Sequence, residues 1–90
     1  MEMFSLMKMP SRYPQLAETW NNKGNAFKNE GRYVDAINCY DRAIDINPKL
    51  AKAWYNKGLA LQKLSREKEA QVALIMAMEL GHIASQTIQT

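Results

Sequence analysis

The sequence predicts an all-α fold of antiparallel helix-turn-helix repeats, and two observations support this prediction. The first is internal repetition, because at an offset of 34 the chain has nine identical pairs of residues spread over the whole period. The second is the spacing of apolar and small residues within each unit, as in Ala36, Tyr40 and Ala43, which is that of amphipathic helices. The identical pairs are Ala17 and Ala51, Trp20 and Trp54, Asn22 and Asn56, Lys23 and Lys57, Gly24 and Gly58, Ala26 and Ala60, Arg32 and Arg66, Ala36 and Ala70, and Ala43 and Ala77.

Glycine and proline mark the breaks between the predicted helices. Gly31 can adopt the positive φ found at a helix end, and Pro48 cannot continue a helix because it lacks an amide proton. Two helices per repeat, separated by short turns, are then expected to run antiparallel to each other. The helices are predicted at residues 17–30, 33–46, 51–64 and 67–80.

Two further glycines, Gly24 and Gly58, lie inside the predicted helices. Each costs about 1 kcal/mol relative to alanine in such a position, so a tertiary reason is needed for both. We expect that reason to be close helix packing, with the small residues Ala36 and Ala70 on the opposite helices.

The length of 90 residues sets one domain as the upper limit. Within it we expect an N-terminal flank at 1–16, a first repeat at 17–50, a second repeat at 51–84 and a C-terminal tail at 85–90. Cys39 is the only cysteine, so no disulfide can form within the chain, and a reducing cytoplasm is the simplest location. No export signal is visible, and no apolar run approaches the roughly 20 residues that a membrane span requires.

The charge and the reactive residues argue against several classes of function. The net charge of +3 is too small and too dispersed for a nucleic-acid surface, although it mildly favours acidic ligands. Cys39 and His82 are the only thiol and the only imidazole, and no acidic partner stands at a recognisable spacing, so no catalytic dyad is predicted. We expect Cys39 in the core and His82 at a helix end. The sequence therefore predicts neither an enzyme nor a cofactor or metal site.

The residues that recur form a known pattern. In the first unit they are Trp20, Lys23, Gly24, Phe27, Ala36, Tyr40, Ala43 and Pro48, and positions 51–80 repeat the pattern. This order and spacing resembles the tetratricopeptide repeat, and the resemblance covers residues 17–84. It departs from the family in having Lys23 and Lys57 where leucine is common, and His82 where Pro48 leads us to expect a proline.

The resemblance implies that the first helices of the two repeats form a concave face that holds an extended peptide or a partner's helix. Asparagines on such a face suit a peptide backbone because each side chain offers donors and an acceptor, and nearby lysines would attract an acidic peptide. Alternatively, these asparagines are only solvated or hydrogen-bonded to neighbouring helices. The predicted binding residues are Asn21, Asn22, Asn25, Lys28, Lys52, Tyr55, Asn56, Leu59 and Lys63.

Some repeats of this kind hold the carboxylates of a chaperone C-terminus with two asparagines and several cations. Asn25 and Asn56 match the asparagines of that clamp. Asn21 stands where its first lysine belongs, and the cations of a third repeat are missing. The resemblance to the clamp is therefore incomplete.

The last predicted helix is unusually apolar, because Val72, Ile75 and Met76 replace polar residues of the first repeat. A helix that is apolar nearly all round is normally covered on more than one side. The candidate covers are residues 4–7 of the flank, residues 83–88 of the tail, or another copy of the protein. We favour self-association as a dimer through Val72, Ile75 and Met76.

The favoured function is a scaffold or adaptor that binds a protein or peptide on the concave face, with a mild preference for acidic ones, and self-associates through the last helix. The rival hypothesis is a structural, self-assembling helical subunit, or a piece of a longer repeat array, without a dedicated peptide ligand. Neither hypothesis involves nucleic acid or a membrane.

Overall fold

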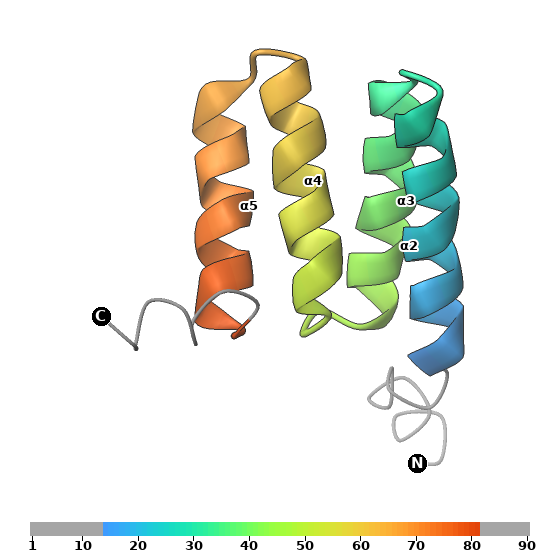
Figure 1. The fold of residues 1–90 in the computed structure, drawn as a ribbon. Coiled ribbons are helices and arrows are strands. Elements are labelled where there is room, and N and C mark those ends of the chain that lie inside the picture. The colour runs from blue at the N-terminus through green and yellow to red at the C-terminus, as the bar shows by residue number, and fades with distance from the viewer. Residues whose placement is uncertain (1–13, 82–90) are drawn as a thin grey trace.

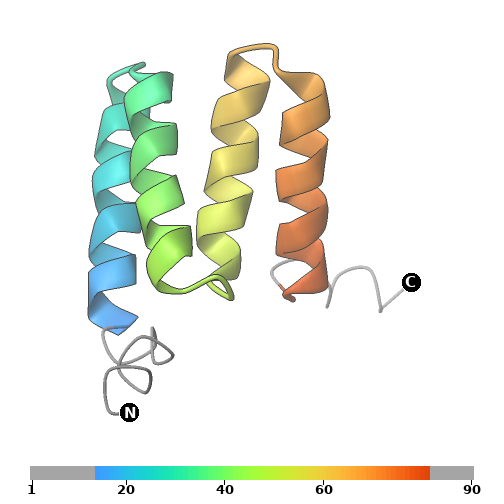
Figure 2. The ribbon, with the colours of Figure 1, turned by 180° about the vertical axis from the view of Figure 1, so that it is seen from behind.

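The computed structural model describes residues 14–81, and this part of the chain is all α-helical (Figure 1). Successive helices are joined by short turns and run in opposite directions, so that α2 with α3 and α4 with α5 form two antiparallel hairpins (Figures 1 and 2). The hairpins lie side by side, with α3 against α4. The helices are α2 (Pro14–Asn29), α3 (Tyr33–Ile46), α4 (Ala51–Lys63) and α5 (Glu67–Glu79).

The predicted fold class is confirmed, and the helix bounds agree closely with the prediction. Helix α3 occupies the predicted residues 33–46. Helices α4 and α5 begin where expected and each ends one residue earlier than expected. Helix α2 begins at Pro14 instead of residue 17, because a proline is well tolerated in the first turn of a helix, where its missing N–H would have no intrahelical partner.

The turns inside the two hairpins have the same geometry. At the end of α2, Gly31 has a φ of 80°, and the Arg32 N–H bonds to the Phe27 carbonyl at 2.9 Å. At the end of α4, Ser65 takes the equivalent place with a φ of 61°, and the Arg66 N–H bonds to the Leu61 carbonyl at 2.9 Å. Both helices thus end in a Schellman motif, one built on glycine and one on serine.

The hydrophobic core draws on all four helices. Tyr40 of α3, Leu61 of α4 and Ala73 of α5 belong to one cluster of buried side chains, and Phe27 of α2 packs against it. Cys39 is buried as predicted, and burial raises the pKa of its thiol. This cysteine is therefore a core residue, not a reactive one.

The glycines inside the helices are sites of close packing, as expected, and the expected Ala70 is among the neighbours of Gly58, whereas the nearest atoms to Gly24 belong to Tyr40. Gly24 lies against the ring of Tyr40, and Gly58 lies against the side chain of Leu74 and the backbone of Ala70. The space left by each glycine is therefore filled mainly by a large side chain.

Residues 1–13 and 82–90 lie outside the described residues. They include His82 and both stretches of the chain, 4–7 and 83–88, that were considered as covers for the last helix. Within residues 14–81, no helix combines the length and the apolar character needed to cross a membrane.

Candidate functional site

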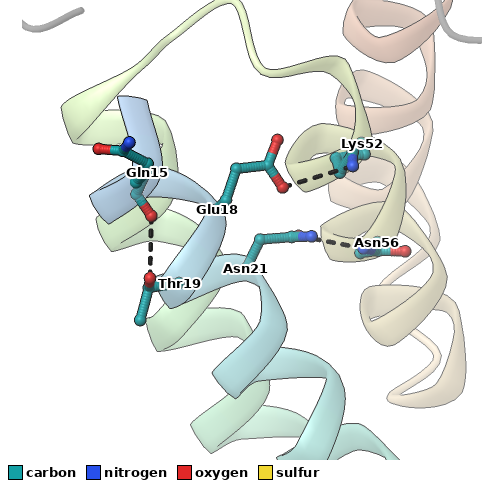
Figure 3. Close-up of polar contacts among 6 residues, drawn as sticks. All are labelled: Gln15, Glu18, Thr19, Asn21, Lys52 and Asn56. Carbon is teal, nitrogen blue, oxygen red and sulfur yellow. Dashed lines mark hydrogen bonds and ion pairs between the residues drawn. The ribbon is translucent and has the colours of Figure 1, made fainter. Parts of the chain in front are cut away.

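The predicted binding residues come from α2 and α4, the first helices of the two hairpins, and we call the surface that they form the α2/α4 face. Two polar contacts join these helices (Figure 3). The Lys52 ammonium lies 3.4 Å from the Glu18 carboxylate, and the Asn56 amide donates a 3.1 Å hydrogen bond to the Asn21 side-chain oxygen. Several of the predicted binding residues therefore hold the two hairpins together.

Asn21 is a correction to the sequence prediction, which placed it facing outward on the α2/α4 face. Its side chain is 2% exposed, because it lies between α2 and α4. A buried amide must be hydrogen-bonded to avoid a cost of about 1–3 kcal/mol, and Asn56 supplies that bond (Figure 3). Asn21 is thus unable to reach a ligand without breaking this pair.

Asn25 is also engaged within the protein. Its side-chain oxygen accepts a 2.6 Å hydrogen bond from the hydroxyl of the buried Tyr40. The alternative interpretation, hydrogen bonding to neighbouring helices, therefore holds for Asn25 and Asn56, the two asparagines that match the carboxylate clamp. Asn22 is exposed.

An open groove of about 630 Å³ lies where α2 and α4 end. Helix α2 contributes Lys28, and α4 contributes Leu59 and Lys63, so three of the nine predicted binding residues meet here. Tyr33, the first residue of α3, also lines the groove and was not predicted as a binding residue. The sequence did distinguish this position, because the equivalent residue of the second repeat is Glu67 and not a tyrosine. The complete lining is Lys28, Asn29, Tyr33, Leu59, Gln62 and Lys63.

The groove is electropositive. Lys28 and Lys63 stand in the last turns of α2 and α4, and no carboxylate of residues 14–81 lines the groove. Neither lysine forms an ion pair with any carboxylate of residues 14–81. Two lysines without a partner in this part of the chain therefore line the groove together with Leu59 and Tyr33, which are half-buried.

A second hollow, of about 290 Å³, is lined by α3, α4 and α5. Its four charged side chains are already paired. The Lys57 ammonium lies 2.7 Å from the Asp41 carboxylate, and Arg66 binds the carboxylate of Glu69. The hydrogen bond from Arg66 lowers the pKa of Glu69, which keeps the pair ionised. This hollow offers a ligand no unpaired charge, so the groove is the better candidate site.

The remaining predicted binding residues lie outside the groove lining. Lys52 is exposed and pairs with Glu18, and Tyr55 is half-buried and makes an interaction of its own. Of the residues predicted for self-association, Val72 is 61% exposed and Ile75 47%, whereas Met76 is half-buried. Among residues 14–81, no group of three or more His, Cys, Asp or Glu side chains is arranged to hold a metal ion.

Two family models match the chain. One, described as TPR repeat, matches residues 24–65, and the other, described as Tetratricopeptide repeat, matches residues 51–80. Together the matches run from residue 24 to residue 80 and include both hairpin turns. No curated protein matches the chain.

Proposed function

Because the chain belongs to the tetratricopeptide repeat family, whose members generally mediate contacts between proteins, we propose that it is a non-enzymatic module that binds an acidic peptide segment. The observation that supports this proposal is the groove on the α2/α4 face, which is lined by Leu59 and by Lys28 and Lys63, two lysines without an ion-pair partner among residues 14–81.

The size and chemistry of the groove suit part of a peptide. Its volume of about 630 Å³ lies within the roughly 300–1,000 Å³ of ligand pockets, and it is open, so a chain can pass through it. Tyr33 and Leu59 offer apolar contact to one side chain of the peptide, while Asn29 and Gln62 offer donors and acceptors to its backbone.

The lysines would set charge preference and association rate more than affinity. An exposed ion pair contributes about 0–1 kcal/mol, and Lys63 is exposed, while Lys28 is half-buried. Two such cations facing one acidic segment raise the association rate at low salt and disfavour basic peptides. We therefore expect micromolar or weaker binding that falls as salt rises.

Selection from a random peptide library tests this function. We expect peptides enriched in Asp and Glu next to a large apolar residue, with affinity reduced roughly tenfold by Lys63→Glu. Lys49→Glu is the matched control, because Lys49 is also exposed and has no ion-pair partner among residues 14–81 but lies outside the groove, and it should leave affinity nearly unchanged. A library that yields no preferred peptide, or equal losses from both variants, would contradict the proposal and favour a purely structural subunit.

Self-association through α5 is a second candidate function. It is supported by the exposure of Val72 and Ile75, and Met78 on the same helix is also exposed. Three of the five large exposed apolar side chains of residues 14–81 thus lie on this one helix. The substitution pair Val72→Asp and Ile75→Asp should give a monomer by light scattering, and a dimer that survives it would show that its interface lies elsewhere.

A further inference from the structure

One stripe of exposed side chains runs along α5, and its residue Val72 also lines the hollow between α3, α4 and α5. Its members are Lys68, Val72, Ile75 and Glu79, and all four are exposed. Their spacing of four, three and four residues places them on the same side of an α-helix, with a charge of opposite sign at either end of two apolar residues. We call these four residues the α5 stripe.

The first repeat shows what normally happens at this place in the fold. The residue of α3 equivalent to Ile75 is Asp41, which lies 2.7 Å from Lys57 of the neighbouring helix α4. Within residues 14–81, α5 has no such neighbouring helix, and the aspartate has become an isoleucine that is 47% exposed. Ile75 therefore stands at a position that carries a paired charge in the first repeat, and it has replaced that charge with apolar surface.

We propose that the α5 stripe packs against the α5 stripe of a second copy, antiparallel and around a two-fold axis that passes between residues 73 and 74. The arrangement follows from the symmetry of the spacing, since Val72 and Ile75 are equidistant from that axis, and so are Lys68 and Glu79. Val72 then meets the partner's Ile75, and Lys68 meets the partner's Glu79. This proposal rests on the self-association suggested above and defines its geometry.

Charge complementarity singles out a second copy of α5 in this orientation. Lys68 and Glu79 have no ion-pair partner within residues 14–81, and the antiparallel pairing gives each of them one. A parallel pairing would instead set Lys68 against the partner's Lys68, which is repulsive.

Head-to-tail stacking of α5 on α2 of another copy is disfavoured for a related reason. The position on α2 equivalent to Lys57 is Lys23, whose ammonium lies 5.2 Å from the centre of the Trp20 ring. Arg42 lies over the same ring at 5.2 Å. Within the chain, Lys57 of α4 meets the carboxylate of Asp41 of α3. In such a stack the equivalent Lys23 would meet Ile75 instead, so its ammonium would lose water without gaining a carboxylate partner.

The dimer should be weak. A single pair of 13-residue helices buries less than the roughly 1,600 Å² of a standard interface, so we expect an equilibrium that shifts with protein concentration. Added salt should weaken it further, because the ion pairs at the ends of the stripe are exposed to solvent.

Charge reversal tests the geometry on the full chain. Sedimentation equilibrium should show that Lys68→Glu and Glu79→Lys each raise the dimer dissociation constant roughly tenfold, because two attractive contacts per dimer become repulsive. The double variant Lys68→Glu/Glu79→Lys restores both pairs with their charges exchanged and should return to the wild-type value. An equimolar mixture of the two single variants should form a heterodimer. Circular dichroism confirms that each variant remains folded.

The outcomes separate this proposal from the broader ones. A wild-type chain that stays monomeric at all concentrations overturns the pairing and self-association together. A dimer that Val72→Asp/Ile75→Asp abolishes, but that the double charge swap does not restore, keeps self-association and overturns the antiparallel pairing. Peptide selection at the groove is measured separately and is unaffected by either result.

Discussion

The ring of Tyr40 packs on Gly24 so closely that a Cβ atom there would lie 2.5 Å from the ring atom Cε1. The second repeat has the same relationship at the equivalent positions, because a Cβ atom on Gly58 would lie 2.6 Å from Leu74 Cδ2. These distances are too short for real contacts, so each glycine is required by the side chain opposite it. Each hairpin is held together at this point.

Replacing Gly24 by alanine should therefore destabilise the protein, by about 1–3 kcal/mol, although helix propensity alone would add about 1 kcal/mol of stability. The matched control is Ala26→Gly on the exposed side of the same helix, where only propensity changes and a loss of about 1 kcal/mol is expected. Urea unfolding of both variants measures these changes in the free energy of unfolding. A Gly24→Ala chain more stable than wild type would show that the contact with Tyr40 is not tight.

Replacing the serine at the turn of the second hairpin, Ser65, by glycine should stabilise the protein. Ser65 has a φ of 61°, a region in which a non-glycine residue costs about 1 kcal/mol or more, whereas the equivalent Gly31 has a φ of 80° without that cost. We expect Ser65→Gly to raise the free energy of unfolding by about 1 kcal/mol and Gly31→Ser to lower it by a similar amount. Thermal unfolding of the two variants should shift in opposite directions, and a shift in the same direction would contradict the turn geometry.

The contribution of the hydrogen bond between Asn56 and Asn21 to stability can be measured by comparison with the equivalent position in the first repeat, Asn22. Asn22 and Asn56 occupy the same position in the two repeats, but Asn22 is exposed, while Asn56 donates to the buried Asn21. Alanine changes helix propensity equally at both, so Asn56→Ala should be about 1–2 kcal/mol more destabilising than Asn22→Ala. Equal effects in denaturant unfolding would show that the bond across α2 and α4 contributes nothing.

Stability should fall at high pH because of Tyr40. Desolvation raises the pKa of its hydroxyl from 10.0 to about 12, so the folded state holds the proton more tightly than the unfolded state does. The contribution of this group is complete below about pH 10 and is lost as pH rises toward 12, with a slope of up to about 1.4 kcal/mol per pH unit. Unfolding of Tyr40→Phe over the same pH range should lack this slope. Parallel pH profiles for the two proteins would contradict the assignment.

The repeat pattern predicted most of the fold because each break has a local cause. Gly31 ends one helix through its own conformational freedom, and Pro48 ends another through its missing N–H, so both boundaries follow from single residues. The turn at Ser65 was located by its offset of 34 from Gly31, not by its own side chain. The repeat therefore predicted this turn although Ser65 itself is not a residue typical of a helix end.

The site was predicted only in part because polar character does not reveal burial. Asn21 and Asn22 are adjacent and identical in type, yet one is 2% exposed and the other lies open to solvent. What separates them is a partner 35 residues away, Asn56, whose amide lies within hydrogen-bonding distance only after the two hairpins have packed. Tyr33 was missed for a similar reason, since it reaches the groove from α3 while the prediction considered only the first helix of each repeat.

Backbone amide NMR tests the central claim, that the groove between the ends of α2 and α4 binds an acidic peptide. A peptide chosen by the library selection is titrated into the isotope-labelled full chain, and each amide shift is followed. The largest shift changes should fall at Lys28, Leu59, Lys63 and Tyr33, and with Lys63→Glu the same changes should need roughly tenfold more peptide. Changes confined to α3 and α5, or a titration midpoint that Lys63→Glu leaves unchanged, would contradict the proposed binding site.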